Sequence, residues 1–424
     1  MLFRFVTGQP GRGRRALLGA ALVISVAGAA QQGGWRASAD VVRQASAQQP
    51  GFNFEESRVG AYTLPDPLVT AGGAVRRPDQ WPRRRAEILA AFRENVYGIS
   101  PGPPEHLRFE RIEENARAMG GAATLERIAI VSTQHGSEHR FGLTLFLPNA
   151  RRGRVPVFLL INNRSPSDTD PTRTTQSGFW PAERLVERGY GIAALHNAEL
   201  APDDKDRYRD GIIQLFDGAR GPRARNAWGA LGAWAWGASR AMDYFESDPR
   251  VDLHRVAVVG HSRGGKAALW AGAQDERFAM VVSNESGEGG AALSRRNFGE
   301  TVARITESFP HWFAESYRDF AGRERELPVD QHMLMALAAP RALYVASADA
   351  DLWSDPRGEY LAQVYASPVF GLWGGPPMKA EAMPPLDRPL VAGRRGYHVR
   401  SGVHNLTPYD WDRFADFADG LGWK

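Results

Sequence analysis

The residues best suited to chemistry in this 424-residue sequence surround Ser262. The run 260–264 has the pattern G-x-S-x-G, an apolar run at 256–259 precedes it, and an alanine-rich stretch starts at Lys266. A buried strand, a tight turn and a helix in this order expose the serine hydroxyl at the end of the strand. They also bring the N–H groups at the start of the helix to where an oxyanion would form. The pattern therefore predicts Ser262 as the nucleophile of an acyl-transfer reaction.

A serine hydroxyl becomes a good nucleophile only when a base takes its proton, and four histidines follow Ser262 in the chain. His404 lies in a polar stretch between a predicted strand at 396–400 and a predicted helix at 408–421. In folds with this kind of serine turn the base comes last, after the nucleophile and the acid. His398 is the rival, but alternation within its short strand indicates a structural residue. We therefore predict His404 as the base.

Two carboxylates qualify as the acid that orients this base. Glu285 directly follows the strand predicted over 279–284, and the residues after it are polar. Asp351, with Asp349 nearby, follows the strand predicted over 341–346. Either strand end can hold a carboxylate against an imidazole. The alternative for Asp349 and Asp351 is a purely structural role, in a turn or as a helix cap. The residues alone leave the choice between Glu285 and Asp351 open.

The elements that must position these groups alternate between apolar strands and helices of ten or more residues. Such alternation is typical of a mostly parallel sheet covered on both faces. With the serine turn it predicts the α/β class and, within it, an α/β-hydrolase fold, a three-layer αβα sandwich. Strands are expected at 155–162, 190–195, 256–259, 279–284, 341–346 and 396–400, helices at 81–97, 180–188, 226–245 and 408–421, and an antiparallel hairpin at 125–132 and 141–147.

Composition excludes several classes of function. The chain has 52 basic and 48 acidic residues, and arginines in the first 15 residues supply much of the excess. This balance gives little support to a nucleic-acid partner. The absence of cysteine excludes disulfides, thiolate zinc sites and a cysteine nucleophile. No spacing such as H-E-x-x-H suggests a metal, so we expect neither a metal nor another cofactor.

The N-terminal segment is typical of an export signal. Arginines at 12, 14 and 15 precede an apolar run at 16–28, which is too short to span a bilayer, and small residues follow. We therefore expect a signal peptide at 1–30, a disordered leader at 31–50 and one catalytic domain at 51–424. The mature protein is expected to be periplasmic or secreted, without a membrane segment. The choice between general and twin-arginine export stays open.

Longer motifs carry a family resemblance. The run 260–266 has the form G-x-S-R-x-G-K, and the segment 283–296 reads SNESGEGGAALSRR. Together with YTLPDP at 62–67, DLWSDPRGE at 351–359 and GVH at 402–404, these motifs resemble the glucuronoyl esterases over nearly the whole mature chain. These carbohydrate esterases cleave the ester between the glucuronate (or 4-O-methyl-glucuronate) of xylan and lignin alcohols. The lack of cysteine makes the chain similar to the bacterial branch, because fungal members carry a disulfide-bonded cysteine at the position of His261.

The resemblance implies roles for the residues around the serine turn. Ser262 matches the nucleophile of the family, His404 its base and Glu285 its usual acid. Asp351 matches a second acidic position, which some bacterial members keep or use instead. Arg263 matches the arginine whose guanidinium assists the oxyanion.

Three further positions match residues that grip the glucuronate, namely Lys266, Glu300 and Trp353. Their chemistry suits a sugar acid, because an ammonium, a carboxylate and an indole can bind hydroxyl groups and a ring face. The ordinary alternatives are a solvated helix position for Lys266, a helix-capping partner for Glu300 and core packing for Trp353. The expected ligand is therefore a glucuronate ester, and the oligomeric state is not predicted.

Two other functions remain as alternatives. An acetyl-xylan or other carbohydrate esterase on the same fold would need the serine turn but no grip on a uronate. A catalytically silent carbohydrate-binding protein would need neither the serine nor the base to be intact.

Overall fold

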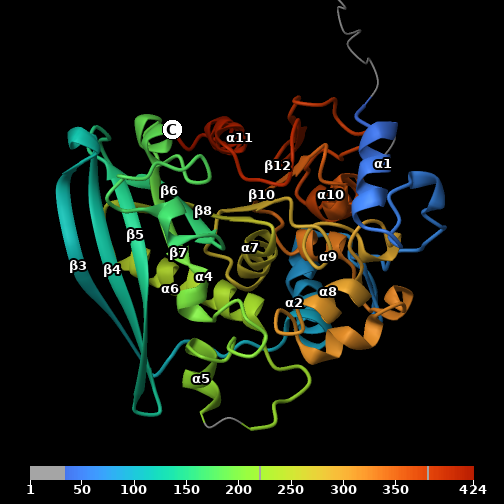
Figure 1. Cartoon of the computed structure of the whole chain (residues 1–424), viewed down its shortest axis with the longest axis horizontal. Coiled ribbons are helices and arrows are strands. Elements are labelled where there is room, and N and C mark those ends of the chain that lie inside the picture. The colour runs from blue at the N-terminus through green and yellow to red at the C-terminus, as the bar shows by residue number, and fades with distance from the viewer. Residues whose placement is uncertain (1–33, 219–220, 380–381) are drawn as a thin grey trace, which may run out of the picture. The chain divides into compact units, whose positions relative to one another are not determined.

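The strands expected from the sequence lie side by side in one sheet (Figure 1). The computed structural model describes residues 34–218, 221–379 and 382–424. Within them, the six central strands run parallel, and the strands at both edges are antiparallel. The spatial order is β11 (Leu390–Ala392), β12 (Arg395–Arg400), β10 (Ala342–Ala348), β9 (Met280–Asn284), β8 (Val251–His261), β6 (Val155–Asn162), β7 (Gly191–His196), β5 (Ser137–Pro148), β4 (Ala123–Gln134) and β3 (His106–Ala118).

Side chains alternate between the two faces of this sheet and build a separate apolar core on each. In β6, Val157, Leu159 and Ile161 pack into one core, whereas Phe158 and Leu160 pack into the other. Such alternation follows from the period of two in a strand, and a strand buried on both faces is continuously apolar. The helices are α2 (Trp81–Phe92), α4 (Asn197–Leu200), α5 (Ile212–Asp217), α6 (Ala230–Ser247), α7 (Arg263–Gln274), α8 (Val302–Ser308), α9 (Gln331–Ala336) and α10 (Pro356–Gly371) on the side of the first core, and α3 (Ala182–Glu187) and α11 (Pro408–Gly420) on the side of the second.

The structure confirms the predicted fold class, a mostly parallel sheet between helical layers. All the strands predicted from apolar runs are present, and the predicted hairpin is β4 and β5. The edge strand β3 was not predicted, because most of its side chains are polar and exposed and it shows no apolar run. A small separate hairpin of β1 (Val69–Thr70) and β2 (Gly73–Ala74) was not predicted either.

The expectation of a disordered leader at 31–50 is wrong for part of that segment. Residues 39–48 form α1 (Ala39–Gln48), and Ser38 caps its N-terminus by accepting a hydrogen bond from the Val41 N–H. Val41, Val42 and Ala45 pack against the main core. Their spacing gives the helix one apolar stripe, which the Ala-, Ser- and Gln-rich composition hid. Residues before position 51 therefore take part in the packed structure.

The predicted signal peptide at 1–30 lies outside the described residues. Among the helices that the structure describes, none is long and apolar enough to cross a membrane.

The carboxyl ends of β8 and β9 lie level with each other, and the neighbouring β10 runs two residues further, to Ala348. His261, Asn284 and Ala346 are neighbours across these three strands. The residues that follow each strand therefore emerge at one edge of the sheet, where open α/β sheets bind their ligands. This register brings Ser262 and Glu285 together, although 22 residues separate them in the chain.

Candidate active site

Ser262 occupies a strained turn between β8 and α7. Its backbone has φ 56° and ψ −126°, a conformation that costs a non-glycine residue about 1–3 kcal/mol. Two glycines make the turn possible. A Cβ at Gly260 would lie 1.9 Å from the Gly264 carbonyl oxygen, and a Cβ at Gly264 would lie 2.9 Å from the Ile161 carbonyl oxygen. The turn thus has the geometry that the G-x-S-x-G pattern predicts, with the serine at the N-terminus of a helix.

His404 lies in the loop between β12 and α11, beside the serine turn. The centroid of its ring is 4.4 Å from that of His261, the residue directly before the serine. His261 is buried and fixed by a hydrogen bond of 2.6 Å between its Nδ1 and Asn284 Oδ1. Among the described residues, the Ser262 hydroxyl has no hydrogen-bond partner. Catalytic hydrogen bonds are often longer in the free enzyme and tighten in the complex with substrate.

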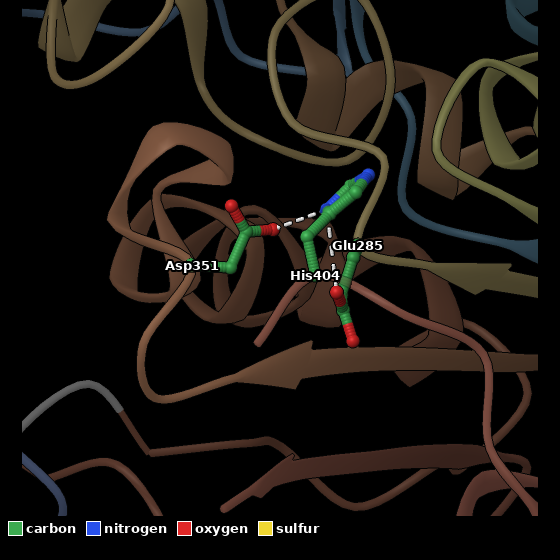
Figure 2. A group of neighbouring side chains, drawn as sticks. All are labelled: Glu285, Asp351 and His404. Atoms are coloured by element: carbon green, nitrogen blue, oxygen red, sulfur yellow. Dashed lines mark hydrogen bonds and ion pairs between the residues drawn. The ribbon is translucent and has the colours of Figure 1, made fainter. Parts of the chain in front are cut away.

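Both candidate acids face the same nitrogen of His404 (Figure 2). His404 Nδ1 lies 2.6 Å from Asp351 Oδ2 and 3.3 Å from Glu285 Oε2. Asp351 follows β10 and Glu285 follows β9, so neighbouring strands supply the two carboxylates. Asp349, the other candidate of the sequence analysis, accepts a hydrogen bond from the Gly402 N–H and supports the histidine loop from outside this group.

Glu285 is bound to the loop that carries the histidine. Its Oε1 accepts a hydrogen bond of 2.6 Å from the Arg400 guanidinium, and its Oε2 accepts one of 2.8 Å from the Asn405 N–H. Burial raises the pKa of Glu285 to about 7, and Asp351 adds to the increase, whereas His404 and Arg400 oppose it. Glu285 is therefore the more deeply buried acid and has the larger share of structural contacts.

The two carboxylates change the basicity of the imidazole. Desolvation lowers the pKa of His404, but Asp351, followed by Glu285, outweighs it and raises the pKa to about 10. The side chain of His404 remains 38% exposed, so it can reach a ligand from the solvent side. A strong base held by an acid on one ring nitrogen leaves the other ring nitrogen free to take a proton.

His398 is placed as the structural residue that the sequence analysis expected. It is buried, and its Nε2 lies 2.8 Å from Asp410 Oδ1. Its Nδ1 lies 3.0 Å from the Tyr344 hydroxyl. Both ring nitrogens are therefore occupied inside the core.

Arg263 follows the serine directly and its side chain is 33% exposed. It lies over the ring of Trp312, with 4.9 Å between its guanidinium carbon and the ring centroid. One of its terminal nitrogens donates to Asp203 Oδ2. Its Nε is buried and, in the part of the chain that the structure describes, has no hydrogen-bond partner. The guanidinium is therefore held on one side and has an unused donor.

Lys266, Glu300 and Trp353, the three positions predicted to bind the glucuronate, lie together. Lys266 Nζ donates to the carbonyl oxygens of Ser286 and Glu288 and lies 3.9 Å from Glu300 Oε2. Burial raises the pKa of Glu300, and the nearby Lys266 and a hydrogen bond from Trp353 oppose this increase. Burial likewise lowers the pKa of Lys266, against the attraction of the surrounding carboxylates. The lysine is one helical turn from Ser262, so this polar group borders the serine turn.

Glu285, Asp351 and His404 also form the one group in the described residues whose donor atoms, within 4.8 Å of one another, could hold a metal ion. Their direct contacts account for the arrangement without an ion, because the imidazole already lies at hydrogen-bond distance from a carboxylate.

Three residues around the site, Asp203, Arg400 and Asn405, had no signal in the sequence as site residues. Their contacts join positions more than 50 residues apart or use the backbone.

The parallel sheet and the strained serine turn at the end of β8 define a protein of the α/β-hydrolase class. Comparison with known proteins narrows the class. Residues 130–374 match the family model described as "Glucuronyl esterase, fungi". The chain therefore belongs to the glucuronyl esterase family, a family of carboxylic ester hydrolases, and the predicted resemblance is confirmed.

Individual relatives agree with this assignment. Carbohydrate esterase MZ0003, from an unidentified prokaryote, is 40% identical over 404 residues, which cover 88% of this chain and 93% of the relative. 4-O-methyl-glucuronoyl methylesterase 1 from Phanerochaete chrysosporium is 30% identical over 328 residues, covering 73% of this chain and 62% of that protein. The solved structure of a glucuronoyl esterase from Solibacter usitatus has a TM-score of 0.80 and 41% identity, covering 86% of this chain and 99% of that one.

Proposed function

We propose that this esterase hydrolyses the ester between the glucuronate (or 4-O-methyl-glucuronate) of glucuronoxylan and lignin alcohols. The observation that carries the proposal is the buried Lys266–Glu300 pair one helical turn from Ser262. An ester that lacks a sugar acid would need the serine turn but no such pair. The names of the relatives, glucuronoyl esterase and 4-O-methyl-glucuronoyl methylesterase, support the same substrate class.

The proposed reaction begins with attack by Ser262 on the ester carbonyl. His404 takes the hydroxyl proton as the new C–O bond forms, and the carbonyl oxygen becomes an oxyanion. Collapse of this intermediate breaks the bond to the alcohol, which leaves with the proton from His404. Water, deprotonated by the same histidine, then attacks the acyl-enzyme. The second tetrahedral intermediate then collapses, His404 returns the proton to Ser262, and the free glucuronate is released.

We assign Asp351 as the main partner of the protonated base. It lies 0.7 Å nearer to His404 Nδ1 than Glu285 does, at 2.6 Å against 3.3 Å. Glu285 already binds Arg400 and the Asn405 N–H, so it mainly holds the loop of the base in place. Both carboxylates stabilise the imidazolium that forms during each proton transfer.

The oxyanion would form beside the N-terminus of α7. The Arg263 backbone N–H and the free donors of its guanidinium are the groups that we assign to it. A single such donor is worth about 3–4 kcal/mol of transition-state stabilisation. Lys266, Glu300 and Trp353 would bind the hydroxyl groups and the ring of the uronate.

Hydrolysis of benzyl glucuronate by the wild-type protein and by Ser262→Ala tests the proposal, with an acetylated xylose measured in parallel. We expect the uronate ester to be preferred and the variant to lose at least about 10³-fold of kcat, since removing a nucleophile leaves only residual catalysis. Ser137→Ala, an exposed serine in the β4–β5 hairpin, is the matched control and should keep full activity. A preference for the acetyl ester would replace the substrate assignment by that of an acetyl esterase. No turnover of either ester would favour the binding-protein alternative.

We also propose that the protein is exported after removal of residues 1–30. The basic and apolar pattern of that segment supports this proposal. Mass spectrometry of the protein recovered from the periplasm or medium of a bacterial host should find a chain that starts near residue 30. A full-length chain retained in the cytoplasm would contradict it.

A further inference from the structure

Asp203, in the segment between α4 and α5, binds three side chains next to the serine turn, and no step proposed above uses it. Its Oδ1 accepts a hydrogen bond of 2.7 Å from Trp312 Nε1 and lies 2.9 Å from His311 Nε2. Its Oδ2 accepts a hydrogen bond from the guanidinium of Arg263. The carboxylate therefore has a separate oxygen for the arginine, and the other oxygen is fixed by two groups of one neighbouring segment.

The surroundings of Asp203 keep it charged and in place. Its side chain is 18% exposed and that of His311 is 4% exposed. Burial raises the pKa of Asp203, but His311, Arg263 and Trp312 outweigh this effect and lower the pKa to about 2. The group is thus an anion across the pH range in which an esterase works. The fixed Asp203 carboxylate therefore limits the orientations open to the Arg263 guanidinium.

Arg263 has one further constraint, an aromatic wall. Its guanidinium carbon lies 4.9 Å from the centroid of Trp312 and 5.7 Å from that of Phe309, and these two rings stack at 3.8 Å. Stacking fixes the plane of the guanidinium, whereas the bond to Asp203 fixes its rotation within that plane. With both fixed, the terminal N–H groups that Asp203 does not bind keep one direction.

We infer that Asp203 is a positioning residue that orients the Arg263 guanidinium toward the oxyanion of the bound ester. This inference rests on the proposed oxyanion role of Arg263. Asp203 touches neither the ester nor the serine in the proposed reaction, so it acts only through the arginine. Without the carboxylate, the arginine would keep its charge and its contact with the Trp312 and Phe309 rings, but its rotation would no longer be fixed. Preorganisation of donors is the part of oxyanion stabilisation that such a change removes.

The test measures kcat and KM for Asp203→Asn, with Asp206→Asn as the matched control. Asp206 lies in the same loop, is exposed and loses the same charge when replaced. We expect kcat of Asp203→Asn to fall by about 10- to 100-fold, somewhat less than the loss of a whole donor, with KM within about threefold of wild type. Asp206→Asn should match the wild type, and Asp203→Glu, which can still reach the arginine, should recover a large part of kcat.

A double-mutant cycle separates positioning from a general structural role. In an Arg263→Gln background, Asp203→Asn should change kcat by less than about twofold, because its target is already gone. An unchanged kcat in the single variant would overturn the inference. An equal loss of kcat in both backgrounds would overturn it as well.

A second variant covers the case in which Asp203→Asn does not fold, as judged by its thermal unfolding midpoint. Trp312→Phe removes one donor to Asp203 and keeps an aromatic ring beneath Arg263. It should lower kcat several-fold in the wild-type background and leave it unchanged in Arg263→Gln, and a loss that persists there contradicts the inference.

Each variant is measured on benzyl glucuronate and on 4-nitrophenyl acetate. An enzyme that cleaves only the acetate would refute the proposed substrate, while the role of Asp203 would still be decided on that ester.

Discussion

The two acids at His404 have different contacts, so we expect different effects from replacing each of them by its amide. Asp351→Asn removes the carboxylate that lies 2.6 Å from His404 Nδ1, and the amide that replaces it can also donate to this nitrogen and favour the wrong tautomer. Glu285→Gln instead removes a buried carboxylate that pairs with Arg400. We expect Asp351→Asn to affect mainly catalysis and Glu285→Gln to affect mainly stability.

The magnitude for Asp351→Asn follows from a hydrogen bond to a charged group, worth about 1.5–3 kcal/mol. Because one pKa unit equals about 1.4 kcal/mol, the pKa of His404 should fall by about one to two units. The same energy lost from the stabilisation of the imidazolium lowers kcat by about 10- to 100-fold. Glu285, 3.3 Å from the same nitrogen, remains and prevents a larger loss.

The sign of the pH effect follows from the role of the base. His404 must be neutral to accept a proton, so a raised pKa places the acid limb of kcat/KM above the ordinary histidine range near pH 6.5. Two carboxylates raise this pKa to about 10 in the wild type. Loss of the nearer carboxylate, Asp351, should shift the acid limb of kcat/KM to lower pH. The maximal rate should fall at the same time.

Glu285→Gln leaves Arg400 with Asp410 as its remaining carboxylate partner, at 3.0 Å. Breaking a buried ion pair costs about 3–5 kcal/mol, and the remaining partner reduces this cost to about 2 kcal/mol. Above pH 7, where Glu285 is ionised, the thermal unfolding midpoint should therefore fall by several degrees, whereas Asp351→Asn should leave it near that of the wild type.

The assay is the pH dependence of kcat/KM on benzyl glucuronate from pH 5 to 11, with the unfolding midpoint measured on the same samples. Asp349→Asn, two residues from Asp351, removes a carboxylate that binds the Gly402 N–H and not the imidazole, so it should leave the acid limb at the wild-type pH. The reasoning is refuted if Glu285→Gln costs more kcat than Asp351→Asn, or if the limb of Asp351→Asn stays in place.

Three further outcomes follow. Trp353→Ala should raise KM for benzyl glucuronate about tenfold without changing kcat on 4-nitrophenyl acetate, because it removes a donor to Glu300 and a ring face, whereas the exposed Trp373→Ala should change neither value. Burial raises the pKa of Glu359 to about 8, so the stability it contributes below its unfolded pKa near 4.5 is lost as the pH rises through 8. Glu359→Gln should reduce the fall of the unfolding midpoint between pH 5 and 8, and an unchanged slope would contradict this. Prolonged treatment with EDTA should leave esterase activity within about 20% of the untreated level if the carboxylate–imidazole group works without a metal, and a loss that added metal restores would exclude the proposed chemistry.

The parallel core of the fold was predictable because its strands are buried on both faces. A strand such as β6 is apolar at every position before its last residue, Asn162, and the strand-to-helix change around Ser262 shows in its glycines and alanines. The edge strand β3 lacks this signal, because an edge position exposes most of its side chains. The helix α1 lacks it for another reason, since three small apolar residues do not stand out in a polar segment.

The site was predictable only where the fold fixes a position in the chain. Ser262 and His404 follow their strands at expected places, and so do both acids. The choice between the acids was not predictable, because β9 and β10 are neighbouring parallel strands and each is followed by an acid. What distinguishes Glu285 from Asp351 is Arg400, a contact across 115 residues that no local pattern records.

Arg400 also explains why two acids at one base are not redundant. It binds Glu285, Asp410 and the carbonyl oxygens of Val403 and Asn405, and so connects β9, α11 and the loop that carries His404. A carboxylate that neutralises this buried cation must remain in place, and part of its charge is compensated there. Among the residues that the structure describes, no arginine or lysine lies within hydrogen-bond distance of Asp351, which directs its charge at the imidazole. The separation of loop anchoring from base polarisation therefore follows from the position of one buried arginine.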